Sequence, residues 1–297
     1  MTAVASTRPG LIGTIARLRQ CRDFQRQPIR AIWSRIWWKL RWAFFDKPCR
    51  LKLLDKYEID VPRTGSGGLI QAYGCSEPET LEFVRTFLEP GMTFWDIGAH
   101  IGEFSIIAAS RIGPTGCIEA FEPQPAMFPF LEANCKNNVT CKIELHKLAV
   151  TERTGETLVF LHPDPARAHL HRDTTSSNQT LKVGTISLDD FLAESPRKPD
   201  LIKVDVEGAE QIVLRGATAT LHLPEEDAPV WLFEYDPQNC ATFGYHPQEL
   251  IESFHNLGYR TYWVADDGRL QSTKKPQAFA FGSNVVASKR PLVEGLA

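Results

Sequence analysis

From about residue 75 to the C-terminus, short apolar runs alternate with amphipathic stretches that have helical spacing. Apolar runs of this length, bounded by polar and turn-forming residues, are typical of buried strands. Strands that alternate with helices pair in parallel, so the pattern predicts an α/β fold with a mostly parallel sheet. The expected strands are Thr93–Ile97, Cys117–Phe121, Ile143–Val150, Leu201–Val206 and Val230–Glu234.

Three further signals lie before, within and at the end of this repeating pattern. Residues 76–79 form a capping box with a proline in the first turn, which predicts a helix ending near Leu88. The polar stretch 162–180 predicts a long loop, and long loops in compact domains usually carry function. Two final apolar runs, Tyr259–Val264 and Phe281–Ala287, lie around an Asp-Asp-Gly turn and predict an antiparallel pair at the sheet edge.

Residues 28–45 combine large apolar and basic residues at helical spacing, and four of the seven tryptophans lie between Trp33 and Trp42. The pattern predicts an amphipathic helix with an aromatic face and a basic face. Three interpretations stay open: packing on the domain or on a second subunit, a lid over the substrate cleft, and a membrane-surface helix. We therefore divide the chain into a basic, Trp-rich helical extension, residues 1–74, and an α/β domain, residues 75–297.

Charge is divided unevenly between these parts. The net charge is −3, but residues 1–56 carry thirteen Lys and Arg against three Asp, about +10, which leaves about −13 for the remainder. An acidic domain opposes a nucleic-acid groove, so no nucleic-acid partner is expected. Seven cysteines without a CxxC pair are typical of reduced thiols and predict no zinc site. The reduced thiols lead us to expect a cytoplasmic protein. No apolar stretch is long enough to span a bilayer, and the extension leaves peripheral membrane contact open.

The first predicted strand ends in an acid followed by a glycine-rich turn. Asp96 precedes Gly98 by two residues, and Gly102 closes the turn before the next helix. Dinucleotide enzymes use G-x-G-x-x-G at this place to seat a pyrophosphate, which an acid would repel. An acid suits the zwitterionic tail of S-adenosylmethionine instead, and glycines let the backbone approach a ligand closely. The expected cofactor residues of this turn are Asp96, Gly98, Ala99, His100 and Gly102.

The ends of the second and third strands suit the rest of a nucleoside. Glu122, followed by Pro123, ends the second strand, where a carboxylate can accept hydrogen bonds from ribose hydroxyls. Ala149 and Val150 end the third strand, where the adenine ring is expected. Together with the glycine turn, these residues predict S-adenosylmethionine as the cofactor and methyl transfer as the reaction.

Carboxylates also cluster after the fourth and fifth strands. Asp205 and Glu207 lie on one face because side chains alternate along a strand, and Glu234 ends the neighbouring strand. Open α/β sheets bind ligands at this edge, so one of these groups is a candidate for deprotonating or orienting a hydroxyl. Two other roles stay open for these carboxylates: binding of a divalent cation, and capping of the next helix by Glu207 or Glu210. Of these, we expect no metal.

Four motifs together resemble those of the FkbM-type methyltransferases. The resemblance covers roughly residues 75–290 and rests on Phe94–Gly102, Ala120–Pro123, Ser187–Phe191 and Ile202–Glu210. It implies a class I, Rossmann-like methyltransferase fold with strand order 3-2-1-4-5-7-6 and an antiparallel strand seven. It also implies S-adenosylmethionine-dependent O-methylation of hydroxyls on polyketides, sugars or other secondary metabolites.

The family's functional positions carry over residue by residue. Its cofactor loop, ribose acid and strand-four acidic motif fall on Asp96, Gly98, Gly102, Glu122, Asp205, Glu207 and Glu210. One departure is His100, which stands where the family usually has Asn, and a histidine can still form hydrogen bonds.

The leading interpretation is an O-methyltransferase that aligns a small hydroxylated acceptor with the methyl group. Asp205 or Glu207 is the expected base, with Glu234 in support. An N-methyltransferase is one alternative, but base amino-methylases typically place a D-P-P-[YF] turn after strand four, where this chain has D-V-E-G. The other alternative is a non-catalytic protein that retains the fold and binds a membrane or a partner through its basic N-terminal extension.

Overall fold

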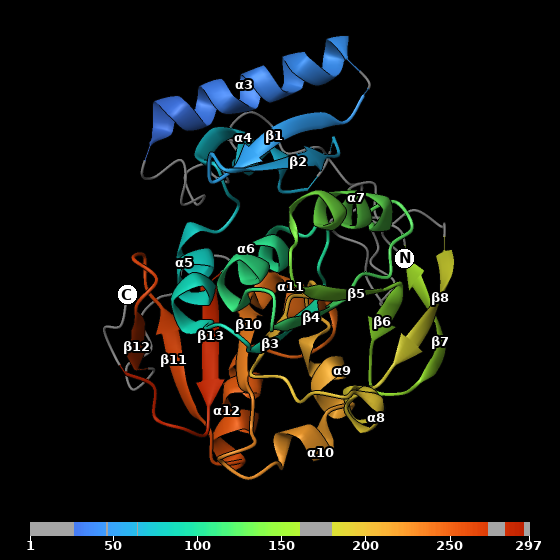
Figure 1. Cartoon of the computed structure of the whole chain (residues 1–297), viewed down its shortest axis with the longest axis vertical. Coiled ribbons are helices and arrows are strands. Elements are labelled where there is room, and N and C mark those ends of the chain that lie inside the picture. The colour runs from blue at the N-terminus through green and yellow to red at the C-terminus, as the bar shows by residue number, and fades with distance from the viewer. Residues whose placement is uncertain (1–26, 46, 64, 161–179, 273–282, 294–297) are drawn as a thin grey trace, which may run out of the picture.

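An eight-stranded sheet organises the fold, in a computed structural model that describes residues 27–45, 47–63, 65–160, 180–272 and 283–293. Within these residues the strand order is β12-β11-β13-β10-β9-β3-β4-β5 (Figure 1). The strands are β3 Thr93–Ile97, β4 Cys117–Phe121, β5 Lys142–His146, β9 Leu201–Val204, β10 Val230–Tyr235, β11 Arg260–Val264, β12 Leu270–Ser272 and β13 Ser283–Ser288. All pairings from β5 to β10 are parallel, whereas β13 runs antiparallel between β10 and β11. This order confirms the predicted class I, Rossmann-like sheet, with β12 added outside β11.

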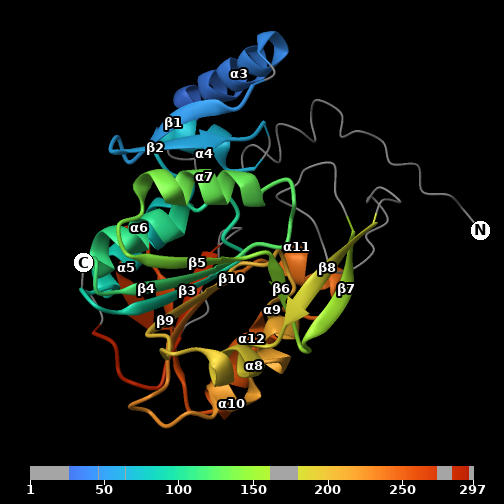
Figure 2. The same cartoon turned by 45° about the vertical axis from the view of Figure 1, so that its right-hand side comes forward.

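Helices cover both faces of the sheet, because successive strand residues point to opposite sides. In β10, Val230 and Leu232 pack on one side, whereas Trp231 and Phe233 pack on the other. The first face is covered by α5 Pro78–Phe87, α6 Glu103–Ile112 and α7 Phe128–Asn138 (Figures 1 and 2). The second is covered by α8 Leu188–Glu194, α9 Glu210–Arg215, α10 Thr218–Leu221, α11 Pro237–Thr242 and α12 Gln248–Asn256. Strands buried on both faces are nearly continuous apolar runs, which is why the sequence pattern located them.

The predicted strand Ile143–Val150 is two strands in two sheets. β5 pairs with β4 as far as His146, which lies opposite Phe121, the last residue of β4. The chain leaves the large sheet at the exposed Lys147 and continues as β6, Leu148–Val150. The single-strand prediction was wrong because the neighbouring strand ends there and no partner remains to extend the ladder.

A separate three-stranded sheet holds β6 together with β7 Gly155–Phe160 and β8 Thr180–Ile186. β8 was not predicted, because its sequence lies between a polar stretch and an expected helix. The predicted loop 162–180 falls almost wholly on residues 161–179, which lie outside the described residues.

The Asp-Asp-Gly turn near the C-terminus does not join the two strands that were predicted to flank it. β11 and β13 form the expected antiparallel pair. The turn at residues 266–268, however, leads from β11 into β12, and β13 lies inside the sheet. The prediction of an edge pair was therefore wrong, because the short strand β12 pairs with β11 and takes the edge.

The N-terminal extension contains a hairpin besides the predicted amphipathic helix. The helix is α3, Pro28–Phe44, and it is followed by the antiparallel strands β1 Cys49–Leu53 and β2 Tyr57–Val61 and by the short helix α4, Gly67–Tyr73. The two five-residue strands alternate too briefly for the sequence pattern to have located them.

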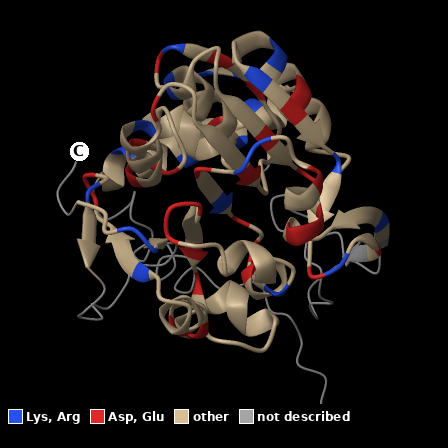
Figure 3. Ribbon diagram, turned by 60° about the horizontal axis from the view of Figure 1, so that its bottom comes forward, with Lys and Arg blue, Asp and Glu red and all other residues tan. Residues whose placement is uncertain are grey.

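Over the rest of the fold, Asp and Glu occur on many helices and loops around the sheet (Figure 3). Within the described ranges, no helix is long and apolar enough to cross a membrane.

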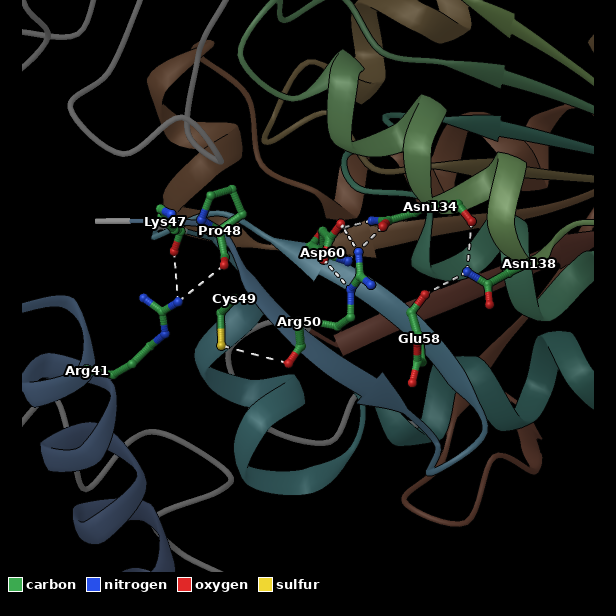
Figure 4. A network of polar contacts seen from close by, with 9 residues as sticks. All are labelled: Arg41, Lys47, Pro48, Cys49, Arg50, Glu58, Asp60, Asn134 and Asn138. Atoms are coloured by element: carbon green, nitrogen blue, oxygen red, sulfur yellow. Dashed lines mark hydrogen bonds and ion pairs between the residues drawn. The ribbon is translucent and has the colours of Figure 1, made fainter. Parts of the chain in front are cut away.

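Two asparagines on α7 attach the hairpin to the domain (Figure 4). Asn134 accepts a hydrogen bond from the Asp60 amide at 2.8 Å, and its Nδ2 donates to the carbonyls of Asp60 and Ile101. Asn138 Nδ2 donates to the Glu58 carbonyl at 2.8 Å. Because Ile101 belongs to the glycine turn after β3, the buried Asn134 connects the extension directly to the predicted cofactor site.

Candidate active site

A cavity of about 410 Å³ lies at the C-terminal ends of β3, β4 and β9. Small-molecule sites are typically ~300–1,000 Å³, and open α/β sheets bind ligands at this edge. The predicted residues that line it are Gly98, Ala99, His100, Glu122, Pro123, Ala149, Val150, Asp205 and Glu207. Asp96, Gly102 and Glu234 do not line it. The structure therefore brings most of the predicted site together in one place.

Contacts between strand ends shape the turn after β3. Gly98 and Gly102 have φ angles of 84° and 88°, in the left-handed region that favours glycine. A Cβ on Gly98 would lie 1.9 Å from the carbonyl oxygen of Asp205, so only glycine lets the end of β3 lie against the end of β9. His100 also has a positive φ, 51°, and its amide donates to Glu122 Oε2 at 2.9 Å. This bond comes from the backbone, so it does not depend on the histidine replacing the family's usual asparagine.

Asp96 lies beneath the turn and is completely buried. Its Oδ2 accepts a hydrogen bond from Ser105 Oγ at 2.6 Å, whereas Oδ1 has no hydrogen-bond partner among the described residues. Burial raises the pKa of Asp96, although the charge of Lys203 and the Ser105 hydroxyl oppose the rise. Of its two predicted roles, positioning the loop fits this placement, and direct contact with the cofactor's ammonium group stays a prediction.

Glu122 follows β4, and backbone amides hold both of its carboxylate oxygens. Oε2 accepts from the His100 amide and Oε1 from the Gln124 amide, each at 2.9 Å. A carboxylate offers about four lone-pair sites, so each oxygen can accept a further hydrogen bond from a hydroxyl. The residue is 4% exposed, and burial raises the pKa of Glu122 to about 7 despite the two amides. Glu122 thus has the cavity access and acceptor capacity that the predicted ribose contact requires.

A buried cation lies among these acidic groups, and the sequence analysis did not select it. The Lys203 side chain is 3% exposed, and its Nζ lies 2.8 Å from Asp205 Oδ2 and 4.4 Å from the centre of the Phe104 ring. Burial lowers its pKa, but the carboxylates of Asp205, Asp96 and Glu77 raise that pKa by more. The ammonium therefore stays charged. A lysine inside an otherwise apolar strand is the sequence signal that could have identified it.

The start of α5 differs from the prediction. Ser76 does not cap the helix, because its amide and hydroxyl both donate to the Glu103 carboxylate, at 2.7 Å each. The N-cap residue is Glu77, which makes no side-chain cap. The capping-box prediction was therefore wrong, since the buried Glu103 takes the Ser76 donors.

Glu77 lines the cavity instead of capping the helix. Asn284 Nδ2 donates to its Oε2 at 2.9 Å. Burial and the nearby charge of Asp205 raise the pKa of Glu77. Nothing in the sequence pattern pointed to Glu77 as a cavity residue, because its helix precedes the first strand of the parallel sheet.

The acidic residues after β9 divide between the cavity and the backbone of their own loop. Glu207 lines the cavity, and Asn239 Nδ2 donates to its Oε2 at 2.8 Å. Glu210 is buried under the loop, where its Oε1 accepts from the Gly208 amide at 3.2 Å and its Oε2 from the Tyr245 hydroxyl at 3.0 Å. Burial raises the pKa of Glu210 to about 7. These contacts hold the loop before α9. The helix has no side-chain cap, so the capping alternative is wrong for Glu210, and this residue does not line the cavity either.

Glu234 lies behind the cavity, on the strand next to Asp205. It follows Phe233, which pairs with Val204, the residue before Asp205. Burial, and then the charge of Asp205, raises the pKa of Glu234 well above its ordinary value. The supporting role of Glu234 stays a prediction. In the described part of the chain, no group of three or more His, Cys, Asp or Glu side chains is arranged to hold a metal ion.

The cavity offers the surfaces that S-adenosylmethionine requires. Phe121, Ala149 and Val150 supply apolar wall for an adenine ring, and Glu122 supplies acceptors for ribose hydroxyls. The paired charges of Asp205 and Lys203 also line the cavity and suit a zwitterionic tail. The donor set therefore fits the cofactor that the sequence predicts.

Comparisons with curated proteins place this cavity in a family context. The hexuronic acid methyltransferase AglP from Haloferax volcanii is 31% identical over 148 residues, which are 49% of this chain and 58% of AglP. The 31-O-demethyl-FK506 methyltransferase FkbM from Streptomyces tacrolimicus is 26% identical over 149 residues, which are 47% of this chain and 56% of that protein. The chain thus aligns with little more than half the length of these relatives.

Solved methyltransferase structures resemble the chain only in outline. The S-adenosylmethionine-dependent O-methyltransferase from Thermotoga maritima has a TM-score of 0.40 at 10% identity, covering 84% of this chain and 80% of that one. The precorrin-6y C5,15-methyltransferase from Geobacter metallireducens has a TM-score of 0.42 at 15% identity, covering 72% and 90%. The methyltransferase FkbM domain model matches residues 96–261, more than half of the chain. The chain therefore belongs to the FkbM family of methyltransferases, whose methyl donor is S-adenosylmethionine.

Proposed function

We propose that the protein is an S-adenosylmethionine-dependent O-methyltransferase whose acceptor is a hydroxyl of a small molecule, a sugar or a secondary metabolite. The observation that carries the proposal is that one cavity joins Glu122, after β4, to the carboxylates Asp205 and Glu207, after β9. Glu122 suits the cofactor's ribose, and the other two suit a reacting hydroxyl. The names of two relatives, which give a hexuronic acid and the 31-O position of FK506 as acceptors, support an oxygen acceptor.

In this proposal, the ends of β3 and β4 hold the cofactor. Glu122 accepts the ribose hydroxyls, while Ala149 and Val150 contact the adenine ring. The turn from Gly98 to His100 and the Lys203–Asp205 ion pair face the amino-acid tail. When bound, S-adenosylmethionine supplies an electrophilic methyl group, so the protein's main task is to align the acceptor oxygen with it.

Glu207 is the proposed proton acceptor. Asp205 Oδ2 is already engaged by the Lys203 ammonium at 2.8 Å, which favours an orienting role for Asp205. Glu207 lines the cavity, and the bond that its Oε2 accepts from Asn239 fixes the carboxylate where it can take a proton from a hydroxyl. Glu234, on the neighbouring strand, would support the cluster, because burial and the charge of Asp205 raise its pKa and so favour its neutral form.

Calorimetry with S-adenosylmethionine tests the cofactor half of the proposal. We expect Glu122→Ala to weaken binding at least about tenfold, because two hydroxyl bonds to a carboxylate are lost. Glu119→Ala is the matched control, since Glu119 is a buried carboxyl on β4 that contacts His146 and does not line the cavity. Equal affinity in wild type and Glu122→Ala would refute the assigned site.

Mass spectrometry tests the acceptor half. Purified protein with S-adenosylmethionine, incubated with panels of hydroxylated and amine-bearing metabolites, should add one CH₂ mass to a hydroxylated compound. Glu207→Gln should lower the rate of that product's formation while leaving cofactor affinity unchanged. A product methylated on nitrogen would favour the N-methyltransferase alternative. Cofactor binding without any product across the panels would favour a non-catalytic role.

We also propose that the protein works in the cytoplasm. The scattered spacing of the seven cysteines supports this location, because such cysteines are typical of proteins whose thiols stay reduced. Thiol titration of the denatured, unreduced protein should therefore find all the cysteines free. Disulfides in the protein as isolated from its source cells would contradict the proposal.

A further inference from the structure

The most apolar face of α3 points away from the protein. Trp33 is 66% exposed and Phe44 is 77% exposed, although side chains of this size are usually buried. They belong to a stripe that repeats every three or four residues, which we call the outer stripe: Ile29, Ile32, Trp33, Ile36, Trp37, Leu40 and Phe44. In both Figure 1 and Figure 2, α3 lies at the periphery of the molecule, with the hairpin and α4 on one side of it.

The opposite face of α3 attaches the helix to the rest of the extension. Ala31 and Trp42 are buried, and Ser34 Oγ donates to the Gly68 carbonyl at 3.3 Å. Trp38 Nε1 donates to the Arg63 carbonyl at 3.1 Å. The helix is therefore held without the outer stripe, and folding of the described chain leaves that stripe uncovered.

Basic side chains flank the outer stripe, and acidic ones are absent from this stretch of sequence. At 3.6 residues per turn, Arg30 and Arg41 lie on one side of the stripe, and Arg35 and Lys39 lie on the other. Residues 24–45 contain no Asp or Glu. The charge of about +10 on residues 1–56 contrasts with about −13 on the remainder, so this end of the molecule is attracted to a negative surface.

We propose that α3 lies in the surface of an anionic lipid membrane, with the outer stripe among the upper acyl chains and the flanking Arg and Lys at the headgroups. This inference is independent of the proposed methyl transfer. Interfacial helices have an apolar aromatic face bordered by basic residues, and tryptophan prefers the headgroup region. The cytoplasmic leaflet is negatively charged, which supplies the complementary charge. The stripe suits a lipid surface better than α3 of a second copy of this chain, because two such helices would bring their flanking cations together.

Docking through α3 would place the candidate active site close to the membrane. Gly67 in α4 contacts the Trp38 ring, since an added Cβ there would lie 2.9 Å from the ring's edge. Ser66 and Leu69, beside it in the chain, line the cavity. One short helix thus separates the membrane-facing helix from the wall of the cavity, and its contacts to both would fix their relative orientation.

Vesicle flotation with the full-length chain tests the proposal. Wild type should float with vesicles of phosphatidylserine and phosphatidylcholine, and much less with pure phosphatidylcholine or at high salt. The double variant Trp33→Ser, Trp37→Ser should lower the bound fraction at least about tenfold, because two large apolar groups no longer leave water. The charge variant Arg30→Glu, Lys39→Glu should also reduce binding. The matched control, Lys136→Glu with Lys147→Glu, makes the same change in net charge at exposed positions of the domain and should bind like wild type.

Three results would overturn the proposal. They are equal flotation of wild type and the double tryptophan variant, equal flotation on anionic and neutral vesicles, and a wild-type dimer that the tryptophan variant converts to monomer without any vesicle binding. Light scattering detects the last result. Calorimetry with S-adenosylmethionine on the same variants keeps this test separate from the proposed function, because neither tryptophan lines the cofactor cavity. Cofactor affinity should be unchanged even where flotation is lost.

Discussion

Large apolar side chains have opposite fates in the two parts of this molecule. In the α/β domain, Trp95 and Trp231 are completely buried in sheet strands. In α3 of the extension, Trp33 and Trp37 are 66% and 45% exposed, although they too belong to a regular pattern of apolar residues. A periodic apolar pattern therefore identifies a face that avoids water, but it does not say what covers that face. In the domain the cover is the chain itself, and in the extension we propose that it is a lipid surface.

The largest effect is expected where the domain buries charge instead of apolar groups. Lys203→Met would leave the Asp205 and Asp96 carboxylates without the ammonium charge with which both interact. Removing one partner of a buried ion pair costs about 3–5 kcal/mol, and the free energy of unfolding in urea should fall by that amount. Lys142→Met, at an exposed position on β5, should change it by less than about 0.5 kcal/mol. Equal stability of Lys203→Met and wild type would show that the acidic cluster does not need its cation.

The next effect tests the join between the two parts. Asn134→Ala removes three hydrogen bonds made by one buried side chain, two of them to the β2 backbone. We expect a loss of about 2–3 kcal/mol, and faster hydrogen exchange at the β2 amides. Asn138→Ala is the control, because its side chain donates across to the hairpin only once, to the Glu58 carbonyl. Equal exchange rates in the two variants would mean that Asn134 does not hold the extension in place.

Buried carboxyls in the domain should make its stability depend on pH. The pKa of Glu103 is about 7 instead of 4.5, mainly because of burial. Between these values the folded state keeps a proton that the unfolded chain releases, so the stabilisation is complete below pH 4.5 and is lost as the pH rises through 7. From about pH 5 to about pH 8, the free energy of unfolding should fall, and Tm with it. Glu103→Gln should make this fall in unfolding free energy about 2 kcal/mol smaller.

A second carboxyl provides the control for this titration. Arg85 lowers the pKa of Glu82, so that group is already ionised throughout the range. Glu82→Gln should therefore leave the slope of Tm against pH unchanged. If Glu103→Gln shows the same slope as wild type, the Glu103 carboxyl does not titrate in this range.

What the sequence could predict follows the same division between covered and uncovered faces. The five parallel strands and most of the cavity lining were predictable, because strands buried on both faces are apolar runs and their ends meet at one edge. The strand order was predicted only by the resemblance to the FkbM family. Lys203 was missed although a lysine inside an apolar strand is a signal that the sequence shows. Glu77 was missed because it comes from a helix outside the repeating pattern, and its place beside the cavity depends on long-range packing. The split of residues 143–150 was missed for a similar reason, since only the length of the neighbouring β4 ends the first half.

The smallest effect on stability, and the sharpest test of the comparison, lies within α3 itself. Trp33→Ser with Trp37→Ser should change the unfolding free energy by less than about 0.5 kcal/mol for each substitution, because exposed side chains contribute little to folding. Trp38→Ser, one residue further along, should cost about 2 kcal/mol, because its ring packs on Gly67 and its Nε1 donates to the Arg63 carbonyl. Urea unfolding followed by circular dichroism measures both. If Trp33 and Trp37 mattered as much as Trp38, the outer stripe would belong to the fold, and the extension would bury its apolar face in the same way as the domain.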